Sequence, residues 1–258
     1  MNSRKEQLAA VDRLLTIMDE LREQCPWDRK QTFESLRHLT IEETYELGDA
    51  ILARDLEEIK NELGDLLLHI AFYAKLGSEE KAFDMADIAH SISEKLIRRH
   101  PHIYGDVKVE NEEEVKQNWE ALKLKEGKKS VLAGVPKGLP ALVKAQRIQD
   151  KVAGVGFDWE KPEQVWEKVQ EELAEFQAEV EKGHSADREA EYGDLLFSMI
   201  NYARFLKINP DTALERTNQK FTKRFNYLEA KAHALGKSLH DMTLAEMDVY
   251  WEEAKRQS

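Results

Sequence analysis

Residues 42–65 of the chain read EETYELGDAILARDLEEIKNELGD, and residues 171–194 read EELAEFQAEVEKGHSADREAEYGD. Both stretches begin with Glu-Glu-x-x-Glu and end with Glu-x-x-Asp, so one acidic module is written twice. Residues three apart lie on one face of a helix. Two such helices packed antiparallel would bring four carboxylates together, and partly buried carboxylates need protons or a cation. The repeat therefore predicts two pairs of antiparallel helices, each with a cation site.

The residues that follow the acids indicate that these sites lie at the edge of a core. Asp65 precedes Leu66-Leu67-Leu68, and Asp194 precedes Leu195-Leu196-Phe197. Carboxylate oxygens suit Mg²⁺ or Mn²⁺, and Mg²⁺ is commonly shared between carboxylates, waters and substrate phosphates. The pattern therefore favours a polyphosphate ester as the substrate.

Composition limits the remaining classes of function. The chain has 258 residues, 34% of them charged, and a formal net charge of -12, which argues against a nucleic-acid backbone as the main partner. A single cysteine, Cys25, excludes an internal disulfide and fits a reducing compartment. No secretory signal or membrane-spanning apolar run is visible, so we expect no membrane partner. The simplest expectation is a cytoplasmic enzyme.

Leucines at spacings of three and four predict helix almost throughout, and hence an all-α fold of two tandem helical-bundle modules. In the first half we expect a helix over 5–24, a helix that starts at Thr40, one that runs from Asp55 to Gly77, and one from Ser78 to Arg99. In the second half we expect helices over 162–183 and 187–206 and a long helix from 209 onward. The lysine- and glycine-rich stretch before residue 140 reads as a linker. We place the modules at 1–125 and 141–258, with the linker over 126–140.

Basic and aromatic residues repeat in the same order as the acids. Lys95 and Arg99 share a helix face in the first half, and Lys220 and Arg224 hold the same spacing in the second, where Trp251 follows. Such a cationic pair can bind phosphate oxygens, and an indole can stack on a base.

Simpler interpretations exist for each of these residues. Thr40-x-x-Glu43 also matches a capping box, in which Glu43 would only close a helix end. Exposed basic residues are ordinary on a solvated helix face, and Trp251 is a candidate core residue. Duplication of the full acidic pattern argues against the capping interpretation, because the second copy lacks a capping residue.

The combined motifs resemble the MazG family of nucleoside triphosphate pyrophosphohydrolases. The resemblance is carried by Cys25-Pro26-Trp27-Asp28-x-x-Gln31-Thr32, by both acid clusters, and by a glycine, Gly64 or Gly193, before each aspartate. It covers nearly the whole chain. It implies an all-α fold, dependence on Mg²⁺, homodimerisation, and cleavage of nucleoside triphosphates to monophosphates and pyrophosphate. In the second half Gly156-Phe157-Asp158-Trp159 replaces the Cys-Pro-Trp-Asp motif, so the modules are not equivalent.

Carried over position by position, the resemblance places functional residues in the second module. The implied metal ligands are Glu172, Glu175, Glu191 and Asp194. The implied nucleotide-binding residues are Lys168, Val169, Gln170, Glu171, Glu172, Lys220, Arg224 and Trp251. Two-domain members are expected to use the C-terminal module for catalysis and the N-terminal one for assembly or weaker activity. The first module nevertheless keeps a second candidate metal site and a second candidate phosphate site. These consist of Glu43, Glu46, Glu62 and Asp65, and of Lys95 and Arg99.

These assignments give a mechanistic hypothesis. Mg²⁺, or Mn²⁺ in its place, would bridge the triphosphate and orient a water for attack on the α-phosphorus. The catalytic candidates are Glu171, Glu172 and Glu175, and the sequence does not choose the base between Glu171 and Glu175. The alternatives are a non-catalytic, metal-dependent nucleotide sensor or dimeric interaction protein, and a hydrolase that removes a non-standard or regulatory nucleotide.

Overall fold

The computed structural model describes residues 1–109, 111, 114–115, 130–183 and 185–256, and within these residues it contains helices and turns but no strand. The predicted all-α class is confirmed. Two compact units divide the chain, Met1–Lys108 and Val109–Ser258, and each contains one of the acidic repeats. None of the helices in the described part is both long enough and apolar enough to cross a membrane.

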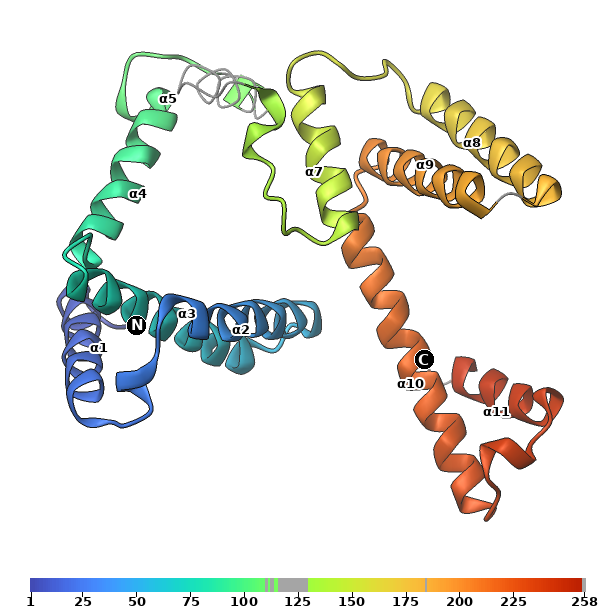
Figure 1. Ribbon diagram of the computed structural model, residues 1–258, viewed down its shortest axis with the longest axis horizontal. Coiled ribbons are helices and arrows are strands. Elements are labelled where there is room, and N and C mark those ends of the chain that lie inside the picture. Colours follow the sequence, from blue (N-terminus) through green and yellow to red (C-terminus); the bar gives the residue numbers. More distant parts are fainter. Residues whose placement is uncertain (110, 112–113, 116–129, 184, 257–258) are drawn as a thin grey trace. The chain divides into compact units, whose positions relative to one another are not determined.

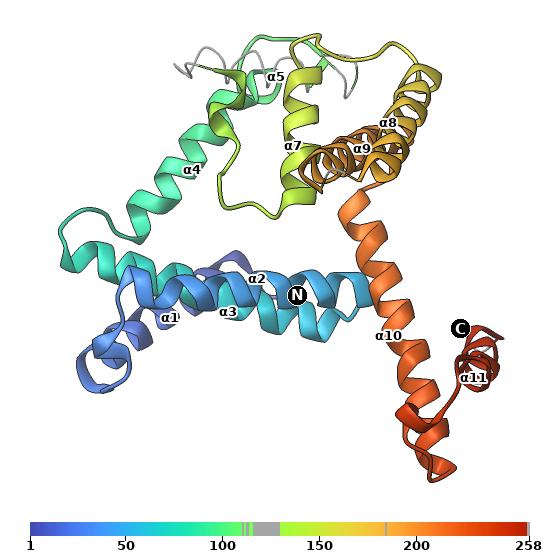
Figure 2. The ribbon, with the colours of Figure 1, turned by 45° about the vertical axis from the view of Figure 1, so that its right-hand side comes forward.

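The first unit is built on a hairpin of two antiparallel helices, α2 (Phe33–Ala53) and α3 (Leu56–Glu79), which lie side by side (Figures 1 and 2). As predicted, Asp55 starts the second of them, and its carboxylate accepts hydrogen bonds from the backbone N–H groups of Glu57 and Glu58 at 3.1 and 3.2 Å. Such a cap satisfies N–H groups that have no partner inside the helix. Helix α1 (Arg4–Gln24) packs on α3 and is followed by a short 3-10 turn, Asp28–Lys30.

A small hydrophobic core joins these three helices. Its buried residues are Met18, Leu36, Phe72 and Leu76, and half-buried Phe33, Leu39, Leu68 and Tyr73 pack against them. Helices α4 (Met85–Arg99) and α5 (Pro101–Tyr104) complete the first unit.

The second unit repeats the hairpin with α8 (Pro162–Lys182) and α9 (Ser185–Phe205) (Figure 1). The predicted end of α8 is confirmed at Gly183, whose left-handed φ of 82° suits a residue without a side chain. Helix α7 (Ala141–Ala153) packs on α9, and α10 (Pro210–Ala234) pairs with α11 (Leu244–Arg256). The predicted start of the long helix is also confirmed, because the Asn209 side chain accepts from the Thr212 N–H at 2.9 Å.

The expected helix start at Thr40 is wrong. Helix α2 begins seven residues earlier at Phe33, because Thr32 and Ser35 cap it reciprocally, with the Ser35 hydroxyl accepting from the Thr32 N–H at 2.8 Å. Thr40 lies inside the helix and donates its hydroxyl to the Leu36 carbonyl at 3.0 Å. Glu43 therefore also lies inside α2 and does not close a helix end, so the capping interpretation is wrong.

The expected break at Gly77 and Ser78 is also wrong. Helix α3 continues through both residues to Glu79, and the next long helix begins after Asp84, which caps it together with Asp87. Gly77 is required for close approach, since a Cβ atom there would lie 2.5 Å from the Phe83 ring.

The predicted linker falls partly outside the described residues, since its first positions are 126–129. The rest of it is held against the second unit, in which Lys151 donates to the Val131 carbonyl at 3.2 Å and Lys144 to the Lys137 carbonyl at 2.7 Å. A 3-10 turn, Val131–Gly134, packs on α7. The module boundary near residue 125 stays a prediction.

Candidate active site

Each acidic hairpin brings three carboxylates together. Oxygen atoms of Glu172, Glu175 and Glu191 lie within 4.8 Å of one another in the second unit, and the corresponding three acids do so in the first. The three acids of the first unit are Glu43, Glu46 and Glu62. The spacing along the sequence therefore predicted the grouping of these six carboxylates, because α2 with α3 and α8 with α9 pack as antiparallel pairs.

The two aspartates stand beside these groups. Asp194 and Asp65 are exposed and fall outside the two sets of close oxygen atoms. Each still lies close enough to act electrostatically, because Asp194 raises the pKa of Glu191 and Asp65 raises the pKa of Glu43.

Lys168 partly neutralises the acids of the second unit, which we name the second cluster: Glu172, Glu175, Glu191 and Asp194. Its ammonium lies 2.7 Å from a carboxylate oxygen of Glu172 and 2.9 Å from one of Glu171. These hydrogen bonds raise the pKa of Lys168. Burial, followed by the charges of Glu175, Asp194 and Glu172, raises the pKa of Glu191. Negative charge therefore remains after the ion pair has formed.

The acids of the first unit, which we name the first cluster, have a different neighbour. Lys168 lies four residues before Glu172 on α8. The residue four positions before Glu43 on α2 is Leu39. Glu62 is only 8% exposed, and its Oε2 atom has no hydrogen-bond partner among the described residues. Burial and the surrounding acids raise the pKa of both Glu43 and Glu62.

A hydrogen-bonded chain lies one turn beyond the first cluster. The Nδ1 atom of buried His69 is 2.9 Å from the Thr40 hydroxyl, which is 2.8 Å from the Tyr73 hydroxyl. Burial lowers the pKa of His69, although Asp65 acts in the opposite direction. This hydrogen-bonded chain was not predicted from the sequence, because Thr40 was expected at a helix end and lies inside α2.

Both clusters have the chemistry of a site for a hard divalent cation. Their side-chain donors are carboxylate oxygens, they belong to opposing helices, and buried Glu62 has an oxygen without a partner among the described residues. Hard oxygen donors of this kind suit Mg²⁺ and Mn²⁺. A bound cation would offset the charge that raises the pKa of Glu191, Glu43 and Glu62.

The remaining predicted residues of the second unit form a separate group. Lys220 and Arg224 lie on α10, whose main packing partners are α11 and α7. Trp251 on α11 packs against the Phe221 ring with 4.9 Å between ring centroids. The Nε atom of Arg224 is buried without a hydrogen-bond partner among the described residues. Trp251 therefore contacts the helix that carries Lys220 and Arg224.

The predicted basic pair of the first unit lies on α4. Lys95 is exposed and Arg99 is half-buried. Lys95 lines a shallow hollow with Phe83, Asp87 and Ile88.

Comparisons with known proteins give one family. The sequence model described as the MazG nucleotide pyrophosphohydrolase domain matches residues 31–104 and again residues 160–228. The chain is 43% identical over 256 residues to a protein of Escherichia coli strain K12 named nucleoside triphosphate pyrophosphohydrolase, with 96% of this chain and 97% of that protein covered. It is 42% identical over 256 residues to a Thermotoga maritima protein named nucleoside triphosphate pyrophosphohydrolase/pyrophosphatase MazG, with 97% and 98% covered.

Proposed function

The chain belongs to the MazG nucleotide pyrophosphohydrolase family, and from that premise we propose that it hydrolyses nucleoside triphosphates, ribo and deoxy, to monophosphates and pyrophosphate. The observation that carries the proposal is the second cluster, in which opposing helices bring Glu172, Glu175 and Glu191 together. The names of the relatives from Escherichia coli and Thermotoga maritima support the same class of reaction.

We assign Mg²⁺ as the ion of the second cluster, with Mn²⁺ as a substitute. Glu172, Glu175, Glu191 and Asp194 would hold it. Bound there, Mg²⁺ would neutralise phosphate charge and lower the pKa of a water molecule. Buried Glu172 sets the inner wall of the site, while exposed Glu175 and Asp194 leave its outer side open to a triphosphate.

The chain's own residues would align the phosphates and accept the proton. Water attacks the α-phosphorus, a new P–O bond forms, and the bond from the α-phosphorus to the oxygen bridging to the β-phosphorus breaks, so that pyrophosphate leaves. Glu171 or Glu175 would take the proton from the attacking water, and both are exposed. Lys168 would bind a phosphate oxygen, since its ammonium already lies at the edge of the cluster.

Lys220, Arg224 and Trp251 remain proposed nucleotide-binding residues on the resemblance. The buried Nε atom of Arg224, which lacks a partner among the described residues, supports an anion-binding role for that side chain. Lys220 and Arg224 would bind phosphate oxygens that the metal does not reach. Lys95 and Arg99 hold the same proposed role in the first unit.

We propose that the chain forms a homodimer through its acidic hairpins. The hairpin of α8 and α9 leaves seven large apolar side chains between 42% and 50% exposed. These are Trp166, Leu173, Val180, Tyr192, Leu196, Phe197 and Met199. Contiguous exposed apolar surface commonly marks an interface, and two helices become a four-helix bundle when a second hairpin covers them. A second copy would present the same apolar side chains, as a two-fold interface requires.

The dimer proposal has a direct test. Light scattering after size exclusion should give twice the chain mass for the wild type and one chain mass for Leu196→Glu. Glu189→Gln on the same helix is the control, since Glu189 is polar and exposed. A wild type that runs as a monomer at micromolar concentration would refute the proposal. A cytoplasmic location, without nucleic-acid or membrane partners, stays a prediction.

Product analysis tests the reaction itself. The purified chain is incubated with ATP, GTP, CTP, UTP and their deoxy forms, in Mg²⁺ and in chelator. We expect monophosphate and pyrophosphate only with the metal, and loss of turnover by at least about 100-fold in Glu172→Gln, because a metal ligand supports several kcal/mol of transition-state stabilisation. Glu43→Gln is the matched variant in the first unit. Diphosphate and phosphate as products would overturn attack at the α-phosphorus.

Two alternatives give different results in the same assay. A nucleotide sensor would bind nucleotide in a metal-dependent manner without forming products. A hydrolase for a non-standard or regulatory nucleotide would turn over the common triphosphates poorly. Retention of turnover in Glu172→Gln together with its loss in Glu43→Gln would move catalysis to the first unit.

A further inference from the structure

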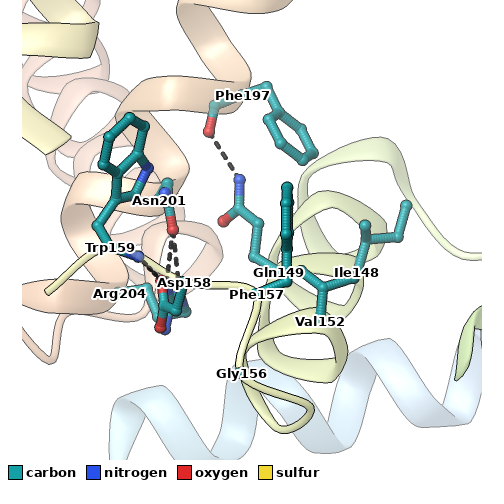
Figure 3. Close-up of a pocket in the computed structure, with 10 residues that line it drawn as sticks. All are labelled: Ile148, Gln149, Val152, Gly156, Phe157, Asp158, Trp159, Phe197, Asn201 and Arg204. Atoms are coloured by element: carbon teal, nitrogen blue, oxygen red, sulfur yellow. Dashed lines mark hydrogen bonds and ion pairs between the residues drawn. The ribbon is translucent and has the colours of Figure 1, made fainter.

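A cavity of about 450 Å³ lies in the second unit, between the end of α7, the turn that follows it, and α9 (Figure 3). Aromatic rings from two segments line it: Phe157 and Trp159 from the turn, and Phe197 from α9. Phe157 is 77% exposed and Trp159 is 45% exposed, so both rings can be covered by a ligand. Sites for small molecules commonly have aromatic walls and volumes of roughly 300 to 1,000 Å³. The cavity therefore has the size and the lining of such a site.

An amide in the cavity wall has one atom without a partner. Gln149 is 3% exposed, and its Nε2 atom donates to the Phe197 carbonyl at 2.8 Å. That bond fixes the orientation of the amide, because a carbonyl oxygen can only accept. The Oε1 atom is therefore an acceptor, and it is buried without a hydrogen-bond partner among the described residues. In Figure 3 it points toward the side of the cavity where Trp159 and Asn201 lie. A buried acceptor of this kind is costly until a donor reaches it.

A second amide supplies the opposite polarity. The Oδ1 atom of Asn201 accepts from Arg204 Nε at 3.1 Å and from Arg204 Nη2 at 2.8 Å. Because a guanidinium can only donate, these bonds fix the orientation of the Asn201 amide as well. Its Nδ2 group is thereby left as a donor in the same cavity as Gln149 (Figure 3).

The charged residues of the cavity neutralise each other. Asp158 accepts from Arg204 Nη1 at 2.8 Å and from Arg204 Nη2 at 2.5 Å. Together with the bonds to Asn201, all three nitrogen atoms of the guanidinium have acceptors in the cavity wall. A phosphate or a carboxylate would have to displace Asp158 from this pair. The cavity therefore suits an uncharged ligand.

The cavity draws its walls from segments other than those that carry the proposed contacts to the nucleotide. Its lining comes from α7, the following turn and α9. The proposed nucleotide-binding residues lie on α8, α10 and α11, and include Lys168, Lys220 and Trp251. The ligand of the cavity is therefore a second molecule and not a part of the triphosphate.

From these observations we propose that the cavity binds a small, uncharged aromatic carboxamide. A carboxamide carries an N–H donor and a carbonyl acceptor on one planar group. Its N–H group donates to Gln149 Oε1, and its carbonyl accepts from Asn201 Nδ2. Its ring stacks on the uncovered rings of Phe157 and Trp159, as flat aromatic groups do. The assignment does not rest on the proposed hydrolysis.

The first unit has filled the corresponding place. Phe72 stands where α9 has Asn201, seven residues after the aspartate of the acidic pair. It is 2% exposed and belongs to the hydrophobic core that includes Met18 and Leu68. The carboxamide site is therefore a property of the second module.

Benzamide is the probe for this site in the full chain. The chain has 5 tryptophans, whose indole N–H groups give separate signals in a ¹⁵N correlation spectrum, and Trp159→Phe and Trp251→Phe assign two of them. We expect benzamide to give a saturable shift of the Trp159 signal and to leave the Trp251 signal in place. Movement of the Trp251 signal alone, or no movement of either signal, would overturn the proposal.

Two analogues of the probe test the chemistry. Methyl benzoate keeps the ring and the carbonyl but has no N–H donor, so it should bind about tenfold more weakly, as for one hydrogen bond to a buried acceptor. Benzoate should also bind more weakly than benzamide, because the Arg204 guanidinium already has acceptors. Equal binding of benzamide and methyl benzoate, or tighter binding of benzoate, would contradict the assignment.

Substitution then identifies the acceptor. In Gln149→Met the difference between benzamide and methyl benzoate should disappear, whereas Gln146→Met, the same change one turn earlier on α7, should keep it. Asn201→Phe, which introduces the residue of the first module, should abolish the Trp159 shift. A difference that persists unchanged in Gln149→Met would remove Gln149 from the site and with it the proposal.

A competition experiment separates this site from that of the triphosphate. Saturating α,β-methylene-ATP with Mg²⁺ should leave the benzamide titration of Trp159 unchanged, and displacement of benzamide would assign the cavity to the substrate and overturn the proposal. The outcome for the proposed function is distinguishable. Absence of triphosphate hydrolysis would remove the reaction and leave the carboxamide site standing, and a missing benzamide shift would do the reverse.

Discussion

Replacing Lys168 by leucine, the residue that the first module has in the same place, should make the stability of the second module depend on Mg²⁺. In the wild type Lys168 forms ion pairs with Glu172 at 2.7 Å and with Glu171 at 2.9 Å. The Glu172 side chain is 9% exposed and that of Lys168 is 35% exposed. The substitution therefore leaves a nearly buried carboxylate without an ion-pair partner among the described residues.

The magnitude follows from the burial of the two partners. At an effective dielectric of about 20, two unit charges 4 Å apart attract by about 4 kcal/mol. Desolvation of both groups and solvent screening at the exposed lysine offset much of this attraction. We expect a loss of about 1 to 2 kcal/mol, between the values for exposed and buried pairs.

Urea unfolding of the full chain, in chelator and at saturating Mg²⁺, measures the effect. The loss should be present in chelator and should shrink in Mg²⁺, because the bound ion takes over neutralisation of Glu172. By linkage, the apparent affinity for Mg²⁺ should rise by about five- to thirtyfold. Turnover should nevertheless fall, since Lys168 is also proposed to bind a phosphate oxygen.

The control is Lys182→Leu on the same helix. Lys182 pairs with Glu179 at 2.5 Å and is 58% exposed, so its loss should leave the free energy of unfolding nearly unchanged in both conditions. Equal destabilisation of Lys168→Leu in chelator and in Mg²⁺ would refute the reasoning, as would no destabilisation in either.

For two glycine substitutions and two changes of pH, the structure determines the direction of the change in stability or in Mg²⁺ affinity. Gly77→Ala should lower the free energy of unfolding in urea by about 1 to 3 kcal/mol, because its Cβ atom would lie 2.5 Å from the Phe83 ring. Gly48 has open space around it, so Gly48→Ala should raise the free energy of unfolding by about 0.5 to 1 kcal/mol. Burial lowers the pKa of His69, so the unfolded chain takes up that proton first. Stability should therefore fall as the pH drops through about 6.5 toward the folded-state pKa, and His69→Gln should flatten that part of the profile. The raised pKa of Glu191 means that protons compete with Mg²⁺ at a higher pH than for a free glutamate, so calorimetric Mg²⁺ affinity should already weaken as the pH falls toward 5.

Local sequence signals predicted the helix ends where a single side chain decides them. Asp55 and Asn209 cap their helices and Gly183 ends one, because each acts on backbone groups within a few residues of itself. Thr40 failed as a start signal because Thr32 and Ser35 form an equivalent cap further upstream. The sequence contains two caps of similar form, and packing of Leu36 in the core favours the longer helix.

The acid clusters were predictable for a related reason. Their spacing is internal to two uninterrupted helices, so antiparallel packing alone brings Glu172 and Glu191 together. The cavity lined by Gln149, Trp159 and Asn201 was not predictable in this way, because these residues come from three segments that meet only through packing of α7 on α9. The signal present in the sequence was the pair of aromatic residues in the short turn after α7, to which we assigned no role.

The two modules differ in how they compensate the same four acids, and this difference makes a last prediction. Lys168 neutralises part of the charge in the second module, whereas Leu39 in the same place cannot do so in the first. The pKa of Glu43 and of Glu62 is raised, and the Oε2 atom of Glu62 is buried without a partner among the described residues. A cation that enters the first cluster should therefore stabilise its hairpin more than the same cation stabilises the hairpin of the second module.

Amide hydrogen exchange resolves the two hairpins within the intact chain. Addition of Mg²⁺ should increase protection in α2 and α3 by a larger factor than in α8 and α9, and Glu62→Gln should remove the increase in the first hairpin while leaving the second unchanged. Lys168→Leu should make the second hairpin respond as strongly as the first. If Mg²⁺ protects only α8 and α9, the first cluster holds no cation, and its acids must be compensated by protons on Glu43 and Glu62 instead.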